Sequence, residues 1–271
     1  MKTLRLFAHY AVLILAALIV LFPLYFTIAG ALMTDAQLMR FPPMLVPQEL
    51  HFENFAKVLD AMPLIRQFFN SIFVASAIVL GVLVTSVLAA YVLVFLNIPF
   101  KNVIFGIIML TILVPTESLI VPKYLILVDL RWINSYPGLI VPFVASGFGI
   151  FLMRQFFLSF PKEIYEAARI DGCGHLRFVL TILVPIVRPA LGVLGLYTFI
   201  GSYNMYFWPL LVINTPDMQT LQIGLQALNS SESTQPSLIY AGAAIAIAPM
   251  LVIFYLFQKS IVRGLTSGAV K

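Results

Sequence analysis

The sequence has little charge and a single cysteine. Only 10% of its 271 residues are charged and 61% are hydrophobic, whereas a soluble domain usually has about 25% charged residues. The mean hydropathy is +1.02. The one cysteine, Cys173, excludes a disulfide within the chain and any CxxC metal site. A water-soluble core cannot absorb this much apolar surface, so lipid must be the solvent for much of the chain.

Common catalytic and nucleotide-binding motifs are also missing. The sequence has no HExxH, GxxxxGK[ST] or GxSxG, and its three histidines are far apart. We therefore expect no catalytic residue, no metal site and no cofactor bound by this chain. The net charge of +5 could suggest nucleic acid, but the asymmetric distribution of positive charge in membrane proteins is a simpler cause. Membrane lipid is an expected partner and nucleic acid is not.

Long windows without charge mark the membrane spans, because a helix needs about 20 apolar residues to cross the hydrocarbon core. The first run lacks a small-residue cleavage site, and we interpret it as a retained helix. The third span is weak, since Pro115, Glu117, Pro122 and Lys123 interrupt its second half. Glu117 is either a buried functional carboxylate or a residue at the outer end of that span. Its charged neighbours favour the second interpretation. The sequence predicts six spans, at about residues 9–32, 68–96, 102–126, 136–157, 183–213 and 236–258.

The distribution of Lys and Arg predicts the orientation. With the N-terminus inside, eleven of the 16 Lys and Arg residues lie in inside segments and five in outside segments. Positive charge concentrates on the cytoplasmic side of membrane proteins. Both termini and the charged segment between the fourth and fifth spans are therefore expected in the cytoplasm. The five outside cations are Arg40, Lys57, Arg66, Lys123 and Arg131.

The longest external loop, residues 33–66, contains the rigid sequence FPPMLVP and then a short amphipathic helix. This loop either covers the spans or forms part of a docking surface for an external partner, and the sequence does not separate these two roles. The apolar residues that share a helical face are Phe52, Phe55, Val58 and Leu59.

The largest cluster of charge follows the fourth span. Pro161 with an acidic residue soon after it is typical of a helix start, and Gly172 is typical of the position just past a helix end. The spacing predicts ion pairs of Glu166 with Lys162 and with Arg169. The helix is either a solvated connector or a docking element. Docking is supported by the small residues on one face, which let another surface come close. That face consists of Ile164, Ala167, Ala168 and Asp171.

The register of this segment closely resembles the EAA loop of ATP-binding-cassette (ABC) importer permeases, whose pattern is EAA-x3-G-x9-I-x-L-P. Residues 166–185 read EAARIDGCGHLRFVLTILVP, and the one departure is Val184 where leucine is usual. Six spans with both ends inside are similar to the smaller permease subunit of the carbohydrate-uptake group, which includes the maltose and glycerol-3-phosphate importers. The lead-in RQFFLSFPKEIYEAARIDG and the tail IVRGLTSGAVK also resemble that group.

The resemblance implies an all-α integral membrane protein with six transmembrane helices, in the type I ABC importer permease (MetI-like) fold. One transmembrane permease domain would cover residues 1–271, with a cytoplasmic coupling (EAA) loop at 159–178. The cytoplasmic tail, residues 259–271, would touch an ATPase, or would be a cationic end near anionic lipid. The expected location is the bacterial cytoplasmic (inner) membrane.

In function, the resemblance implies a permease subunit and not an enzyme. It would form half of the path for a sugar or sugar-like solute, with an oligosaccharide as the first choice and glycerol-3-phosphate or a glycerophosphodiester as the alternative. The implied partners are a second permease subunit in a heterodimer, an extracytoplasmic substrate-binding protein, and a cytoplasmic ATPase dimer that binds ATP and Mg. The residues that would contact the ATPase are Glu166, Ala167, Ala168, Arg169, Asp171 and Gly172.

Two other classes of protein have less support. A secondary carrier working alone would need an intramembrane titratable pair, for which the chain offers only Glu117 and the flanking Arg188. A membrane enzyme would need a catalytic cluster, and His175 with Asp171 is too little for one.

The solute path is predicted in the fifth span, at residues 201–209, GSYNMYFWP. Aromatic faces suit the CH face of a sugar ring, and an amide suits its hydroxyls. Tyr and Trp also form interfacial belts, so Trp208 could belong to one. The related group often has Trp-Asn where this chain has Tyr-Asn. The predicted path residues are Tyr203, Asn204, Tyr206 and Trp208.

Overall fold

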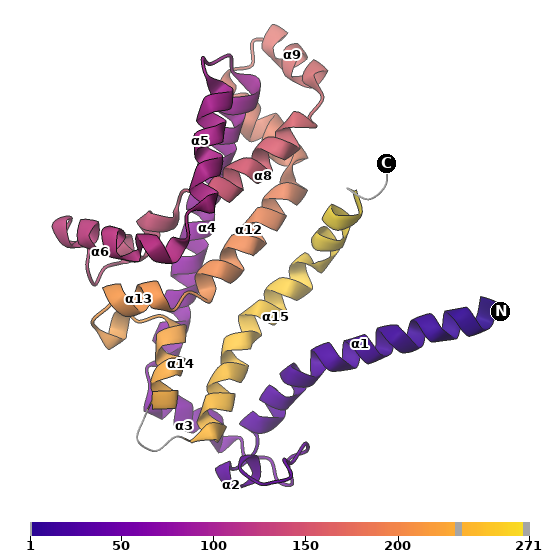
Figure 1. The fold of residues 1–271 in the computed structure, drawn as a ribbon, viewed down its shortest axis with the longest axis vertical. Coiled ribbons are helices and arrows are strands. Elements are labelled where there is room, and N and C mark those ends of the chain that lie inside the picture. The colour runs from indigo at the N-terminus through magenta and orange to yellow at the C-terminus, as the bar shows by residue number, and fades with distance from the viewer. Residues whose placement is uncertain (1, 231–234, 268–271) are drawn as a thin grey trace. The chain divides into compact units, whose positions relative to one another are not determined.

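The computed structural model describes residues 2–230 and 235–267, and no strand occurs among them. The all-α fold expected from the sequence is therefore confirmed for this part of the chain (Figure 1). The chain divides into two compact units, one of residues 1–68 with 221–250 and the other of residues 69–220 with 251–271.

Hydrogen bonds at helix ends hold the first unit together. The Asn54 side-chain nitrogen, in a residue that is 3% exposed, donates to Ala31 O at 3.0 Å and to Met33 O at 2.9 Å, so it satisfies carbonyls at the end of the first helix. Asp35 Oδ1 accepts a hydrogen bond from Ser237 N at the start of the last helix. The helices of this unit are α1 Lys2–Ala31, α2 Asp35–Leu38, α3 Glu53–Ala61, α14 Leu221–Ser230 and the first part of α15 Pro236–Ser267.

Helix α3 confirms the short helix predicted in the first external loop. The residues of its predicted apolar face are not all buried together. Val58 is fully buried, whereas Phe52 and Leu59 are exposed. Beside it, His51 Nδ1 lies 2.7 Å from Glu53 Oε1. This hydrogen bond lowers the pKa of the Glu53 carboxyl, because it stabilises the ionised form.

The second unit is built around α4, Leu64–Phe95, from residue 69 onwards. Its buried core includes Ile78 of α4, Met153 of α8 and Leu194 of α12. The other elements of this unit are α5 Lys101–Leu113, η1 Thr116–Leu119, α6 Ile120–Asp129, α7 Tyr136–Ile140, η2 Val141–Phe143, α8 Gly147–Leu158, α9 Lys162–Ile170, α10 His175–Phe178, the π-helical η3 Val179–Leu183, α11 Val184–Ile186, α12 Arg188–Tyr203, α13 Phe207–Val212 and η4 Pro216–Met218.

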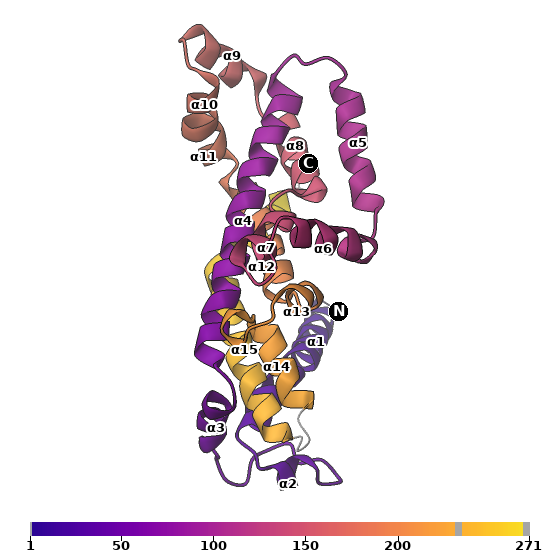
Figure 2. The same ribbon diagram turned by 90° about the vertical axis from the view of Figure 1, so that its left-hand side faces the viewer.

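Three described helices are long and apolar enough to cross a membrane as continuous spans. They are compatible with the first, second and sixth predicted spans. The other three predicted spans correspond to pairs of shorter helices bent by 96°, 45° and 83°. Figure 2 shows the first of these bends, where α6 runs across the direction of α5. The continuous segments are His9–Ala31, Leu64–Phe95 and Pro236–Tyr255, and the bent pairs are Lys101–Leu113 with Thr116–Asp129, Tyr136–Phe143 with Gly147–Leu158, and His175–Ile186 with Arg188–Tyr203.

Proline and serine account for the breaks. Val114 has extended backbone, ψ 118°, because the ring of Pro115 disfavours the helical region for the residue before it. At the second break, Ser146 Oγ accepts a hydrogen bond from Gly149 N and starts α8. At the third, Pro189 lies in the first turn of α12, where its missing N–H is tolerated.

The fifth span, predicted at about residues 183–213, has different ends in the structure. Its helical pair begins at His175 and ends at Tyr203, and α13 is a separate short helix. The chain leaves α12 at Asn204, whose side-chain nitrogen donates to Ile200 O at 3.0 Å. At the C-terminus, the backbone of α15 continues to Ser267. Residues 268–271 of the predicted tail lie outside the described residues.

Candidate functional site

The predicted coupling helix exists and has the predicted ends. Helix α9 follows Pro161 and finishes one residue before Asp171. Gly172 has φ +75°, a left-handed conformation that glycine adopts without steric cost. Cys173 N donates to Ala168 O at 2.9 Å, which satisfies a carbonyl of the last turn. A side chain at Gly172 would meet no atom within 4 Å, so backbone conformation is what selects glycine there.

Five of the six predicted coupling residues are exposed, and Ala168 is the exception. Ala168 is 7% exposed and belongs to the core of the second unit, so its side chain is turned away from the surface on which Ala167 lies. Ile170 is 85% exposed and adds an apolar side chain to that surface. The exposed coupling residues are Glu166, Ala167, Arg169, Asp171 and Gly172.

The two ion pairs predicted on this helix do not form. Neither Lys162 nor Arg169 has a nitrogen within 4.0 Å of a Glu166 oxygen in the described structure. Arg169 instead donates from Nη1 to Cys173 O at 2.9 Å. Exposed ion pairs contribute little, and a cation at the end of a helix is stabilised by the free carbonyls there. The Glu166 carboxylate therefore remains available for an external partner.

An aromatic cluster fixes α9 to the end of α4. The ring of Tyr165, on α9, lies 4.9 Å from that of Phe95 and 5.0 Å from that of Phe178, between centroids. The rings of Phe95 and Phe178 are 5.7 Å apart in an edge-to-face arrangement, and Phe178 is fully buried. Phe160, just before α9, packs on both of these rings. Edge-to-face aromatic pairs are favourable, so the helix is held on a rigid base.

A hydrogen bond adds a second link to α4. The Tyr91 hydroxyl lies 2.6 Å from His175 Nδ1, just after the coupling loop turns into α10. Sequence reasoning missed Tyr91, Phe95 and Phe178 because nothing in the chain pattern pairs residues so far apart. The one available signal was the spacing of Tyr91 and Phe95, which puts both aromatic rings on one side of a helix.

Two cavities with polar side chains lie at the bends around α6 and α12, and the larger of these two polar cavities has a volume of about 700 Å³. It lies where the bent pair of α5 and α6 faces α12, with Ile78 and Val82 of α4 also in its wall. Hydroxyl groups are its main polar feature, and they come from Thr111, Thr116, Ser146, Tyr197, Thr198 and Ser202.

A smaller cavity of about 290 Å³ brings three of the four predicted path residues together. Asn204 and Tyr206 line it, and so does Trp208, which is 3% exposed and donates from its indole nitrogen to Gly138 O at 3.0 Å. Glu117, in the turn η1 at the bend between α5 and α6, lines it as well.

Tyr203 is the predicted path residue that does not line either polar cavity. It is 1% exposed and its ring stacks on that of Phe199 at 5.7 Å. Its position supports the end of α12, which carries the neighbouring Asn204. Its role as a path residue stays a prediction.

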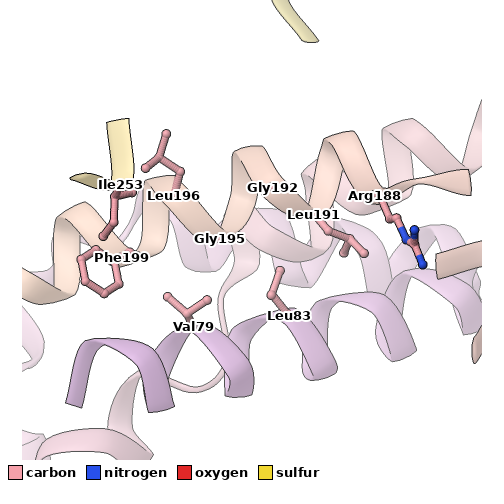
Figure 3. Close-up of a pocket in the computed structure, with 9 residues that line it drawn as sticks. All are labelled: Val79, Leu83, Arg188, Leu191, Gly192, Gly195, Leu196, Phe199 and Ile253. Carbon is pink, nitrogen blue, oxygen red and sulfur yellow. The ribbon is translucent and has the colours of Figure 1, made fainter. Parts of the chain in front are cut away.

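A third cavity, of about 380 Å³, is almost entirely apolar. In Figure 3, Val79 and Leu83 of α4 face α12 across it, and Arg188 marks one end. Gly192 and Gly195 add no side chain to the α12 wall, whereas Leu191, Leu196 and Phe199 of the same helix do. Arg188 is the one polar side chain in this wall, which has no hydroxyl or amide side chain, so the two polar cavities are better suited to a sugar-like solute.

Ligands for a metal ion do not gather in this part of the chain. Among the described residues, no group of three or more His, Cys, Asp or Glu side chains could hold one. The charged side chains at the two polar cavities are those of Lys123 and Glu117. Hydroxyls, aromatic rings and a few charges can bind and release a polar organic solute.

Comparison with known proteins decides the family. Residues 77–267 match the family model of the binding-protein-dependent transport system inner membrane component. The chain belongs to this family. The permease is thus a multi-pass membrane protein and a transport subunit, with ATP hydrolysis on a separate subunit. The importer permease predicted from the EAA register is confirmed.

Three relatives carry the same description, sn-glycerol-3-phosphate transport system permease protein UgpE. The protein of Brucella abortus (strain 2308) is 37% identical over 263 residues, covering 94% of this permease and 93% of the relative. That of Agrobacterium fabrum is 38% identical, covering 96% and 95%. That of Yersinia enterocolitica is 35% identical, covering 98% of both chains.

A solved structure supports the fold. A chain from a bacterial ABC transporter involved in the import of the acidic polysaccharide alginate superposes with a TM-score of 0.82 at 24% identity. The match covers 96% of this permease and 98% of that chain. The predicted type I importer permease fold is confirmed.

Proposed function

We propose that this permease forms half of the translocation path for a sugar or sugar-like solute and couples that path to ATP hydrolysis through α9. The observation that carries this proposal is the placement of α9: an exposed helix of nine residues held on a buried aromatic cluster at the end of α4. A rigidly mounted surface helix transmits movement to the bundle without bending.

The coupling surface consists of the exposed side of α9. Ala167 lets the partner approach closely, Glu166 offers a carboxylate without an intramolecular ion pair, and Gly172 turns the chain back toward the membrane. Ala168 lies on the opposite side of α9, where its small side chain lets the helix pack closely on the core. Arg169 and Asp171 complete the surface at the C-terminal end of the helix.

The proposed partners are those that membership of the family implies. A cytoplasmic ATPase dimer, with ATP and Mg bound to it, contacts α9. A second permease subunit forms the other half of the path, in a heterodimer, and an extracytoplasmic binding protein delivers the solute. The excess of Lys and Arg in the inside segments supports cytoplasmic N- and C-termini.

The path runs through the two polar cavities at α6 and α12, where Asn204 and Tyr206 contact the solute. Trp208 lines the same space and is held by its hydrogen bond to Gly138, and Tyr203 supports the end of α12. A neutral oligosaccharide fits the hydroxyl and aromatic lining. The names of relatives 35–38% identical to this chain favour the second candidate, a glycerol phosphate.

Ala167→Leu tests the coupling proposal. A leucine there adds bulk to the docking face, and we expect the amount of ATPase that copurifies with the tagged permease to fall about tenfold. Solute uptake should fall with it. The measurement is the ratio of ATPase to permease after affinity purification, together with uptake by cells that contain the whole transporter.

Ala16→Leu is the matched control, because Ala16 is exposed on α1 and the substitution adds the same bulk to an apolar surface. This variant should retain both the ATPase and uptake. Normal ATPase recovery and uptake in the Ala167→Leu transporter would contradict the role given to α9.

A further inference from the structure

Lys123 interrupts the second half of the third predicted span, although the orientation count treats it as external. The structure places it on α6, within the bent pair that makes up the third candidate span. Its side chain is half-buried and lines both polar cavities. A cation within a membrane span is costly and marks a functional site by default.

The larger cavity has a charge imbalance. Among the described residues that line it, Lys123 has the one charged side chain. Glu117 lines only the smaller cavity, and its carboxylate is more than 4.0 Å from the Lys123 ammonium. The ammonium lies 4.9 Å from the centroid of the Phe143 ring, a contact that accepts a cation but does not neutralise it. The charge is therefore available to an anionic ligand.

Hydroxyl groups face the same space from α12. Thr198 and Ser202 are four residues apart, so they lie on one side of that helix. Both side chains are partly buried, and neither hydroxyl has a hydrogen-bond partner among the described residues. Free hydroxyls beside an unpaired ammonium are complementary to a molecule that has both hydroxyl groups and a negative charge.

We propose that Lys123 is the specificity-determining residue of the path, and that it binds the phosphate of a phosphorylated polyol while Thr198 and Ser202 bind the polyol hydroxyls. The proposal rests on the function given above and selects the phosphorylated candidate over the neutral one. A lysine binds phosphate as a point charge, without a fixed bidentate geometry, which lets the phosphate leave again. The cavity volume of about 700 Å³ is in the range of small-molecule sites.

The test uses the complete transporter in proteoliposomes, with its second permease subunit, ATPase and binding protein. Uptake of radiolabelled sn-glycerol-3-phosphate and of radiolabelled maltose is measured for the wild type, Lys123→Gln and Lys123→Arg. We expect Lys123→Gln to lower sn-glycerol-3-phosphate uptake about tenfold or more, because a charge-assisted hydrogen bond is lost. Lys123→Arg retains the charge and should remain within about threefold of the wild type.

The matched control is Arg131→Gln. Arg131 follows α6, is exposed, and lines neither polar cavity. This substitution removes the same charge and should leave uptake unchanged. Ser202→Ala is a second variant that alters the cavity without altering charge, and it should lower sn-glycerol-3-phosphate uptake about threefold. ATPase copurification with each variant shows that assembly is intact.

Two results would overturn the inference, and they differ in what else they overturn. If the wild type imports sn-glycerol-3-phosphate and Lys123→Gln imports it as well as Arg131→Gln does, Lys123 has no role in specificity, while the proposed function stands. If the wild type imports maltose and no sn-glycerol-3-phosphate, the phosphorylated solute is wrong and the inference falls with it. The coupling role of α9 is unaffected in either case, because it is measured by ATPase recovery.

Discussion

The coupling loop and the polar cavities belong to the same unit but are built in opposite ways. The loop is a continuous stretch of chain, in which α9 and the turn at Gly172 follow one another directly. The cavities are assembled from segments as distant as α5 and α12. A local element depends on short-range spacing and capping, whereas an assembled site depends on where helices break. The first therefore leaves a readable register in the sequence and the second does not.

The two sites also differ in how they use aromatic residues. At α9, the rings of Phe95, Tyr165 and Phe178 contact one another, although Phe95 and Tyr165 also border a cavity of about 330 Å³. At the cavities, Tyr197 and Tyr206 line open space. Packed rings hold the loop in place, as the proposed coupling role requires, and rings that border space are free to contact a solute.

Phe178→Ala is expected to have the largest effect, and it tests the rigidity of the loop. Phe178 is fully buried, and its truncation should cost about 3–5 kcal/mol of unfolding free energy. Denaturant unfolding of the purified permease in detergent measures this cost. Loosening of α9 should also abolish uptake.

Leu180→Ala is the control for Phe178→Ala, because Leu180 is two residues further along and 59% exposed. Its truncation should change the unfolding free energy by less than about 0.5 kcal/mol. Equal losses in the two variants would mean that the aromatic cluster does not hold the loop.

Asn204→Leu has a smaller expected effect and tests whether the cavities can be altered without disturbing the loop. Asn204 lines the smaller cavity, and loss of its amide should lower solute uptake about fivefold. ATPase recovery should stay at the wild-type level. The matched control is Asn102→Leu, since Asn102 is exposed on α5 and lines neither polar cavity. A parallel loss of uptake and ATPase recovery would indicate a folding defect instead of a path residue.

Trp208→Phe should have the smallest effect on stability and uptake. It tests whether Trp208 supports the cavity wall or contacts the solute. Phenylalanine retains the aromatic packing on Phe143 but leaves Gly138 O without its donor. The expected cost is about 1 kcal/mol of unfolding free energy, measured by denaturant unfolding against Phe207→Leu, an exposed neighbour. A large loss of uptake with unchanged stability would instead make Trp208 a direct solute contact.

The fold class and the coupling loop could be predicted because each depends on local features. Charge-free windows identified the spans, and Gly172 with Pro161 marked the ends of α9. The broken helices were harder to predict. The first break depends on Pro115, which is visible in the sequence, but the bend of 96° depends on what α5 and α6 pack against. Ala168 was assigned to the docking face by helical spacing and by the EAA resemblance, and packing placed it in the core.

The sequence by itself determined that this chain is a membrane permease with a short helix in the EAA register, because hydropathy, positive charge and that register are properties of consecutive residues. Tertiary structure alone decided that Tyr91 and Phe178 support that helix, and that Lys123 shares a cavity with Ser202. The physical reason is distance along the chain. Helical periodicity relates residues within a few turns, whereas a cavity exists only once distant helices have packed and left space between them.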